Sequence, residues 1–258
     1  MDGKINSVLR FHRRIGKPGF AQSRQRSHPF PDPLSLECEC QTHIHGLEEW
    51  NRSFQALKDT LDISVLTGDA LQALYQLELC YLRISNSLRT LFATTSMIFD
   101  KYNDDYARMV YLSRRILQSQ ILRRSTTLFV LPFDVSVQGA LFYVVSRCRH
   151  LPIRREAFQL LQLCPDYEGI WQRASLVAYC NWKVATEEKG RPDGALEIDQ
   201  LPENARVYDE RVSEVVIDGR RLTMISFKRG ALNGVNDDVR NEEVVTNLSM
   251  RLAGLLGT

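Results

Sequence analysis

Residues 140–189 read ALFYVVSRCRHLPIRREAFQLLQLCPDYEGIWQRASLVAYCNWKVATEEK, and this stretch decides the class of fold. Its apolar side chains recur at steps of three and four, which is the spacing of one face of an amphipathic helix. The pattern predicts a short helix over 140–148, a helix that accepts Pro152 in its first turn and stops at Pro165, and a third helix over 168–188. Because only short segments connect them, we expect adjacent helices to pack as antiparallel pairs.

The same spacing continues upstream. It predicts amphipathic helices over 47–61, 69–95 and 104–121, and Asp69 is a suitable N-cap for the second of them. Paired arginines at 114–115 and 123–124 lie near the C-terminal half of the third helix, where positive charge is favourable. We therefore expect a structural role for these arginines.

The pattern changes after Lys189, where GRPDG marks a turn. Two segments with β-branched residues, RVYDERVSEVVID and RLTMISFKR, flank the hairpin signal Asp218-Gly219. Residues 241–256 return to helical spacing, which predicts a C-terminal helix. The predicted fold is therefore mainly α, an array of antiparallel helix pairs with a small C-terminal β-hairpin.

The chain also divides by charge. Residues 1–31 carry seven basic side chains and one acidic side chain, a net charge of +6, whereas the whole chain has +2. We predict a basic, partly disordered segment at 1–45, a helical domain at 46–190, and the hairpin with its C-terminal helix at 191–258. An Arg-rich terminus fits an organelle presequence, a nucleic-acid-binding arm, a localisation signal or a solvated tail.

Composition excludes several classes of protein. With 44% hydrophobic and 25% charged residues the chain is an ordinary globular one. Its longest apolar runs, at 128–133 and 140–145, fall far short of the roughly 20 residues that cross a bilayer. Its first thirty residues lack the apolar segment of a secretory signal, so we expect neither membrane contact nor disulfides. Four cysteines lie in apolar helical contexts and are expected in the core: Cys80, Cys148, Cys164 and Cys180.

No catalytic signature is present. The sequence lacks the phosphate-binding, dinucleotide, metalloprotease and serine-hydrolase motifs. Adjacent acidic pairs at 48–49, 187–188 and 242–243 point to different sides of a helix, so they form no carboxylate dyad and are interpreted as solvated. We predict no catalytic residue, no cofactor and no enzymatic activity.

One segment, CECQTHIH, has the residue types of a metal site. Cys38, Cys40, His43 and His45 are ligands that zinc prefers, but gaps of one residue within each pair are too short for a single tetrahedral ion. We interpret the segment as an irregular loop before the first helix and keep the four residues as weak metal candidates.

A basic cluster raises the question of nucleic acid. Arg147, Arg149, Arg154 and Arg155 could face phosphates together with the basic terminus. Alternatively, these arginines lie on the exposed side of a helix whose other side is packed. No aromatic residues alternate with them, as they do in proteins that bind single-stranded nucleic acid. We favour the exposed helix and expect no direct DNA contact by this chain.

Several short groups of residues follow one another in a characteristic order. They are Cys148-Arg149, Arg154-Arg155, Glu168-Gly169-Ile170-Trp171, Trp182 and Glu187-Glu188, then Pro202-Glu203 and Ala205-Arg206-Val207. This order resembles the C-terminal block of the regulatory domains of fungal zinc-binuclear-cluster transcription factors, and the upstream helix with Trp50 and Phe54 also resembles that family. The resemblance covers roughly 40–230. Its signature residues are expected to be structural: Cys148, Arg149, Arg154, Arg155, Gly169, Trp171 and Trp182.

The resemblance implies a regulatory domain, free-standing or part of a larger product, that modulates transcription of metabolic or secondary-metabolite genes. Its expected partners are proteins of the transcription machinery or a related factor, and its expected location is the nucleus, with the cytoplasm as the alternative. The six-cysteine zinc module of the family has no counterpart here, so its zinc ligands and DNA contacts transfer to no residue.

A different class of function stays open. A helical small-molecule-binding or accessory domain would have a pocket between the 69–95, 104–121 and 168–188 helices. Aromatic residues could line it, although aromatic residues at helical spacing are more often core residues: Tyr81, Tyr106, Trp171 and Trp182.

Overall fold

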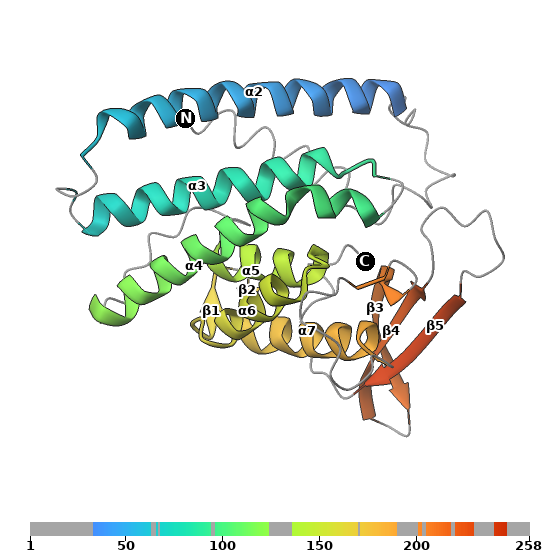
Figure 1. Ribbon diagram of the computed structural model, residues 1–258. Coiled ribbons are helices and arrows are strands. Elements are labelled where there is room, and N and C mark those ends of the chain that lie inside the picture. Colours follow the sequence, from blue (N-terminus) through green and yellow to red (C-terminus); the bar gives the residue numbers. More distant parts are fainter. Residues whose placement is uncertain are drawn as a thin grey trace.

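The computed structural model describes residues 33–62, 66, 68–93, 96–123, 136–169, 171–189, 201–202, 205–217, 220–229 and 240–246. Within them the helices are α2 (Pro33–Thr60), α3 (Gly68–Arg89), the 3-10 helix η3 (Ser96–Tyr102), α4 (Asn103–Arg123), α5 (Val137–Arg147), α6 (Leu151–Gln162) and α7 (Arg173–Glu187). Figure 1 shows α2, α3 and α4 running antiparallel one after another, with α5, α6 and α7 gathered on the other side of α4. The predicted mainly α class and the antiparallel helix packing are confirmed.

The main core lies where α3 to α7 meet. In α4 the predicted stripe is buried throughout, from Tyr106 through Ile116 to Leu117. Helix α5 is buried on nearly every side, since even Gln138 and Gly139 are inaccessible, and it is therefore the central helix of the body. Burial of so many large aliphatic and aromatic side chains is the main stabilising term of the fold.

Helix α2 begins earlier than the sequence predicts. The expected helix over 47–61 starts instead at Pro33, a residue that the first turn of a helix accepts, so the expected disordered segment and irregular loop are wrong over 33–45. Leu36, Cys40 and Leu47 continue one apolar stripe that packs on α3. Polar and cysteine residues separate the members of this stripe, so its spacing in the sequence does not indicate a helix.

The expected helix over 168–188 is wrong at its start. Residues Tyr167–Glu168 and Trp171–Gln172 form a small antiparallel hairpin, β1 and β2, and α7 begins only at Arg173. The hairpin turns at Gly169, whose φ of 61° lies in the left-handed region that glycine adopts without cost. Burial of Trp171 is therefore due to the hairpin and not to a helix face.

The C-terminal part is a three-stranded antiparallel sheet in the order β3 (Val207–Ile217), β4 (Arg220–Arg229) and β5 (Arg240–Thr246). The predicted hairpin is confirmed, with Ile217 paired to Arg220. The predicted C-terminal helix is wrong over 241–246, because the β-branched end of this segment pairs with β4 instead; Val244 lies opposite Ile225. The rest of that expected helix, 247–256, lies outside the described residues.

The sheet stands at the C-terminal end of α7 (Figure 1). Val207, Ile225 and Phe227 belong to the main apolar cluster, and the ring of Phe227 meets that of Trp182 edge-on at 5.1 Å. The sheet is thus fixed to the helical body by one side. Among the described helices none is long and apolar enough to span a bilayer.

Candidate functional site

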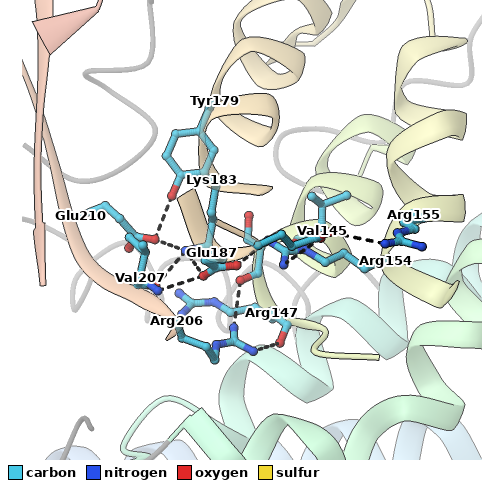
Figure 2. A network of polar contacts seen from close by, with 12 residues as sticks. Val145, Arg147, Arg154, Arg155, Tyr179, Lys183, Glu187, Arg206, Val207 and Glu210 are labelled. Atoms are coloured by element: carbon cyan, nitrogen blue, oxygen red, sulfur yellow. Dashed lines mark hydrogen bonds and ion pairs between the residues drawn. The ribbon is translucent and has the colours of Figure 1, made fainter. Parts of the chain in front are cut away.

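A cluster of buried charges lies where α5, α6 and α7 meet the start of β3 (Figure 2). We call Arg154, Lys183, Glu187, Arg206 and Glu210 the charge cluster. Arg154 is 1% exposed, and Lys183 and Glu187 are 2% exposed. Charged side chains are almost never buried to this degree unless each of them has a partner.

Glu187 is the centre of the cluster. Its carboxylate accepts a hydrogen bond from Arg154 of α6 and lies 3.6 Å from the Lys183 ammonium one turn earlier in α7. The same carboxylate accepts the backbone N–H of Val207 at 2.9 Å. The Glu187 carboxylate thus connects α6, α7 and β3. Arg154 extends the connection to α5, because it also donates to the carbonyl of Val145 at 3.0 Å.

Glu210 of β3 completes the pairing of Lys183. Its carboxylate accepts hydrogen bonds from Lys183 and from the hydroxyl of Tyr179, the latter at 3.0 Å. The pairing of β3 with β4 shifts between Tyr208 and Arg211, which places an extra residue in β3 beside Glu210. Such a bulge redirects side chains locally, and here the carboxylate reaches into the body.

Arg206 caps a helix from a distance in the sequence. Its guanidinium donates to the carbonyls of Arg147 and Ser146, at 3.0 and 3.2 Å, at the C-terminus of α5. The last carbonyls of a helix have no partner within the helix and carry partial negative charge, so a guanidinium satisfies both needs. The guanidinium also lies over the ring of Phe99, 5.9 Å from its centroid.

Arg149 forms a second buried ion pair next to the charge cluster. Its guanidinium binds Asp100 of η3 in a bidentate manner, with one of the two hydrogen bonds at 2.8 Å, and donates to the carbonyl of Leu201 at 2.9 Å. The residue therefore ties η3 to the segment that precedes β3. Bidentate pairing of this kind fixes geometry as well as charge.

The surroundings control the ionisation of these groups. Burial works against the charged form of Glu187, but Lys183, Arg154 and Arg206 outweigh it, and the pKa of the carboxyl is lowered. Burial also disfavours the ionised form of Glu210, but the positive charges of Lys183 and Arg147 outweigh it and lower the pKa of this carboxyl. Burial, and the nearby arginines with it, lower the pKa of Arg206, although Glu187 opposes this. Both carboxylates are thus ionised at neutral pH.

Two interpretations of the basic cluster and the acidic pair are therefore wrong. Arg149 and Arg154 were expected on an exposed helix side, and Glu187 on a solvated face, yet all three are buried and paired. Arg147, which is exposed at the end of α5, and Arg155, whose side chain is 42% exposed and 3.5 Å from Glu188, match the expectation. The sequence contains a signal for the burial of Arg154, because Arg154 shares a helix face with the apolar residues Leu151, Ala157 and Leu161 of α6.

The remaining signature residues form a turn or pack in the core. Gly169 turns the β1–β2 hairpin, Trp171 packs on Phe142 with ring centroids 5.9 Å apart, and Trp182 lies between Tyr179 and Phe227. Cys148 is buried, and burial raises the pKa of its thiol to about 11. The expected core positions of Cys80, Cys148, Cys164 and Cys180 are confirmed. At neutral pH buried thiols of this kind are not nucleophiles.

The weak metal candidates are separated by the helix that contains them. In α2 Cys40 is buried against α3, where its thiol donates to the carbonyl of Leu88 at 3.5 Å, whereas Cys38 is exposed. His43 and His45 lie beside Glu39 and Glu49, at 3.8 and 3.5 Å. Throughout the described part of the chain no three histidine, cysteine or acidic side chains come together as metal ligands would.

The aromatic residues proposed for a ligand pocket pack in the apolar clusters. Tyr106 and Trp171 are buried in the main core, Trp182 lies against it, and Tyr81 contacts the ring of Trp50 at 5.9 Å between centroids. Their arrangement is that of core aromatics at offset and tilted angles.

The charge cluster is suited to joining elements. Each carboxylate is held by at least two donors, and the cations that hold it are buried with it, so a proton-transfer step would break several hydrogen bonds at once.

Comparisons with models of protein families, with curated proteins and with solved structures found no match.

Proposed function

We propose that this chain is a regulatory domain of the type found in fungal zinc-binuclear-cluster transcription factors, and that it modulates transcription through contacts with other proteins. One observation carries the proposal. The separate groups of the resemblance, Arg154, Glu187 and Arg206-Val207, lie far apart in the sequence but contact one another in one buried cluster. A sequence block whose members meet in this way behaves as one structural unit.

The chemistry of the cluster supports a binding domain over an enzyme. Glu187 pairs with Arg154 and Lys183 away from solvent, which favours a fixed arrangement of α6 and α7. A rigid body of this kind presents its outer helices and its sheet to a partner. The proposal assigns the chain to the nucleus, gives it protein partners of the transcription machinery or a related factor, and gives it no cofactor and no DNA contact of its own.

A tethering experiment tests the proposal. The whole chain is fused to a heterologous DNA-binding domain in yeast, and transcription of a reporter with the matching binding site is measured. We expect reporter transcript to change several-fold in either direction relative to the DNA-binding domain alone. The Glu187→Ala fusion should lose the effect because the cluster is broken, whereas Glu156→Ala, which removes an exposed ion pair with Arg114, should keep it.

A reporter level equal to that of the DNA-binding domain alone, with the fusion present at normal abundance in the nucleus, would reject the regulatory role. A fluorescent fusion of the whole chain tests the location separately. Exclusion of the fusion from the nucleus would reject that part of the proposal.

A further inference from the structure

The segment that leads into β3 is bound by the helical body through its main chain. We call residues 201–210 the strap; the structure describes 201–202 and 205–210 of it. At Leu201 the N–H donates to the carbonyl of Arg149 at 3.3 Å, and the carbonyl accepts the Arg149 guanidinium at 2.9 Å. At Val207 the N–H donates to Glu187 and the carbonyl accepts Lys183, both at 2.9 Å. The body thus satisfies both backbone groups at two places, as peptide-binding proteins do for a ligand.

Two side chains of the strap add selectivity. Arg206 donates to the last carbonyls of α5, and Glu210 accepts from Lys183 and Tyr179 (Figure 2). Between them Val207 inserts into the main apolar cluster. The surface therefore fits an arginine, an aliphatic residue directly after it, and a glutamate three residues further on. Opposite charges at two fixed places set the register of the bound segment.

The strap is separated from the rest of the sheet by the bulge in β3. Before the bulge only Val207 and Tyr208 pair with β4, whereas the pairing after it runs without interruption from Arg211 to Ile217. Ile225 of β4 pairs with Val212 after the bulge, and Phe227 lies opposite the bulge itself; both side chains belong to the main apolar cluster. The strap can therefore detach up to the bulge while β4 stays docked.

The kind of contact also favours release. A contact made of buried ion pairs gains little over the separated, rehydrated charges, because desolvation offsets most of the attraction. Lys183, Glu187 and Glu210 would recover hydration when the strap leaves. Among the described residues of the strap, Leu201 and Val207 are the large apolar ones that are fully buried.

We propose that the surface formed by the end of α5, Arg149, Tyr179, Lys183 and Glu187 is a peptide-binding surface that the chain occupies with its own strap. A partner protein with the pattern arginine, aliphatic residue, two further residues and glutamate takes the place of the strap. The strap is part of the same chain and therefore has a high effective concentration at the surface. A partner segment must bind more tightly than the strap, or bind to a chain in which the strap contacts are weakened. The inference does not rest on the proposed transcriptional role.

Amide hydrogen exchange of the whole wild-type chain tests whether the strap detaches. The N–H groups of Leu201 and Val207 should exchange at least a hundredfold faster than those of Val144 and Leu176 in the middle of α5 and α7, and their rates should depend little on low concentrations of urea. Equal protection of all four amides, with the same urea dependence, would mean that the strap leaves only on global unfolding and would overturn the proposal.

A peptide titration tests replacement of the strap. A labelled peptide of residues 201–210 is added to the wild-type chain, to Arg206→Ala/Glu210→Ala, and to the matched control Arg114→Ala/Glu156→Ala, which removes an exposed pair of the same charges. Fluorescence anisotropy should show binding at least tenfold tighter to the strap variant than to the other two proteins. The same peptide with Glu210→Ala should bind at least tenfold more weakly.

Other results would reject the proposal. Absence of peptide binding to a strap variant that keeps its helical circular dichroism and cooperative melting would show that the surface does not accept a segment in trans. If the strap variant does not fold, the exchange experiment on the wild-type chain decides. A stable wild-type dimer in light scattering that dissociates on Arg206→Ala would show that two copies exchange straps, and would overturn the assignment to a different partner.

Discussion

At the scale of single residues the charge cluster is the most consequential feature. Arg154 and Lys183 are fully buried cations that share the carboxylate of Glu187. A buried ion pair adds little net stability compared with an apolar replacement, but removal of one member leaves an uncompensated charge. The helical body therefore depends on Glu187 staying paired with Arg154 and Lys183.

Substitution of Glu187 measures this dependence. Glu187→Ala leaves Arg154 and Lys183 without one carboxylate and the Val207 N–H without its acceptor, so we expect a loss of about 3–5 kcal/mol in the free energy of unfolding. Urea denaturation at pH 7 measures the change. Glu156→Ala, in an exposed pair, should cost no more than about 1 kcal/mol. Similar values for the two variants would contradict the central role of Glu187.

At the scale of elements, carboxylates hold helices together at two further places. Glu78 of α3 accepts from Lys58 of α2 at 3.1 Å and from Arg108 of α4 at 2.6 and 3.0 Å. Glu168 of β1 accepts the first N–H groups of α5, those of Val137 and Gln138. In each case one side chain links elements that are separate in the sequence.

Glu78 makes stability dependent on pH. Burial disfavours its ionised form, but Arg108 and Lys58 outweigh this and lower its pKa below the usual 4.5. A carboxyl whose pKa is lower in the folded state stabilises the fold above its unfolded pKa and loses that effect as the pH falls through the folded one. The wild type should therefore exceed Glu78→Gln in stability at pH 7, and the difference should shrink below about pH 4.5.

Urea titrations of both proteins at several pH values between 7 and 3 measure this difference. The wild type and Glu78→Gln are compared at each pH because Glu168 affects both proteins alike. Burial raises the pKa of Glu168, so its contribution to stability increases as the pH falls, opposite to that of Glu78. A difference that stays constant across this range would contradict the lowered pKa of Glu78.

Two side chains accept hydrogen bonds from the backbone N–H groups of the first turn of α5. The hydroxyl of Ser136 accepts the N–H of Gly139 at 2.9 Å, and Glu168 accepts those of Val137 and Gln138 at 3.1 and 2.8 Å. Loss of the N-cap in Ser136→Ala should cost about 1 kcal/mol in the free energy of unfolding. Glu168→Ala leaves two buried N–H groups without an acceptor and should cost about 2–3 kcal/mol. Guanidinium denaturation of both variants checks this order, and an equal or reversed cost would contradict it.

At the scale of the whole molecule the chain has two apolar clusters of unequal size. The main one runs from α3 through α7 to β4, whereas the smaller one joins α2 to α3 through Leu36, Cys40, Leu47, Ile84 and Leu88. Figure 1 shows α2 as the outermost helix, on the far side of α3 from the rest of the body. Elements with few buried side chains open at lower free energy than the core.

Helix α2 should therefore exchange its amide hydrogens before the central helices do. In hydrogen exchange followed by mass spectrometry, peptides from 40–60 should exchange at least tenfold faster than peptides from 137–147. Leu47→Ala should widen this difference because it truncates the smaller cluster, and Leu57→Ala, at an exposed position of the same helix, should leave it unchanged. Equal protection of α2 and α5 in the wild type would show that the two clusters unfold as one.

Local periodicity by itself determined the helical body and the hairpin. The stripes of α4 and α6 and the Asp218-Gly219 signal identify their elements, because one face of each helix must be apolar and a tight turn needs suitable residues. The start of α2, the β1–β2 hairpin and β5 depended on partners far away in the sequence: α3 covers the widely spaced stripe of α2, and β4 offers an edge to β5.

The pairing of charges within the cluster was decided by the tertiary structure. In the sequence the register of Arg154 with Leu151, Ala157 and Leu161 places it on the apolar face of its helix, but no local pattern shows which groups it meets there. Burial became favourable only when α5, α6, α7 and the strap brought opposite charges and backbone groups together in one place, since an isolated buried charge is too costly to persist. Sequence periodicity reports which face of a helix is apolar, whereas the pairing of charges between elements follows from how those elements pack.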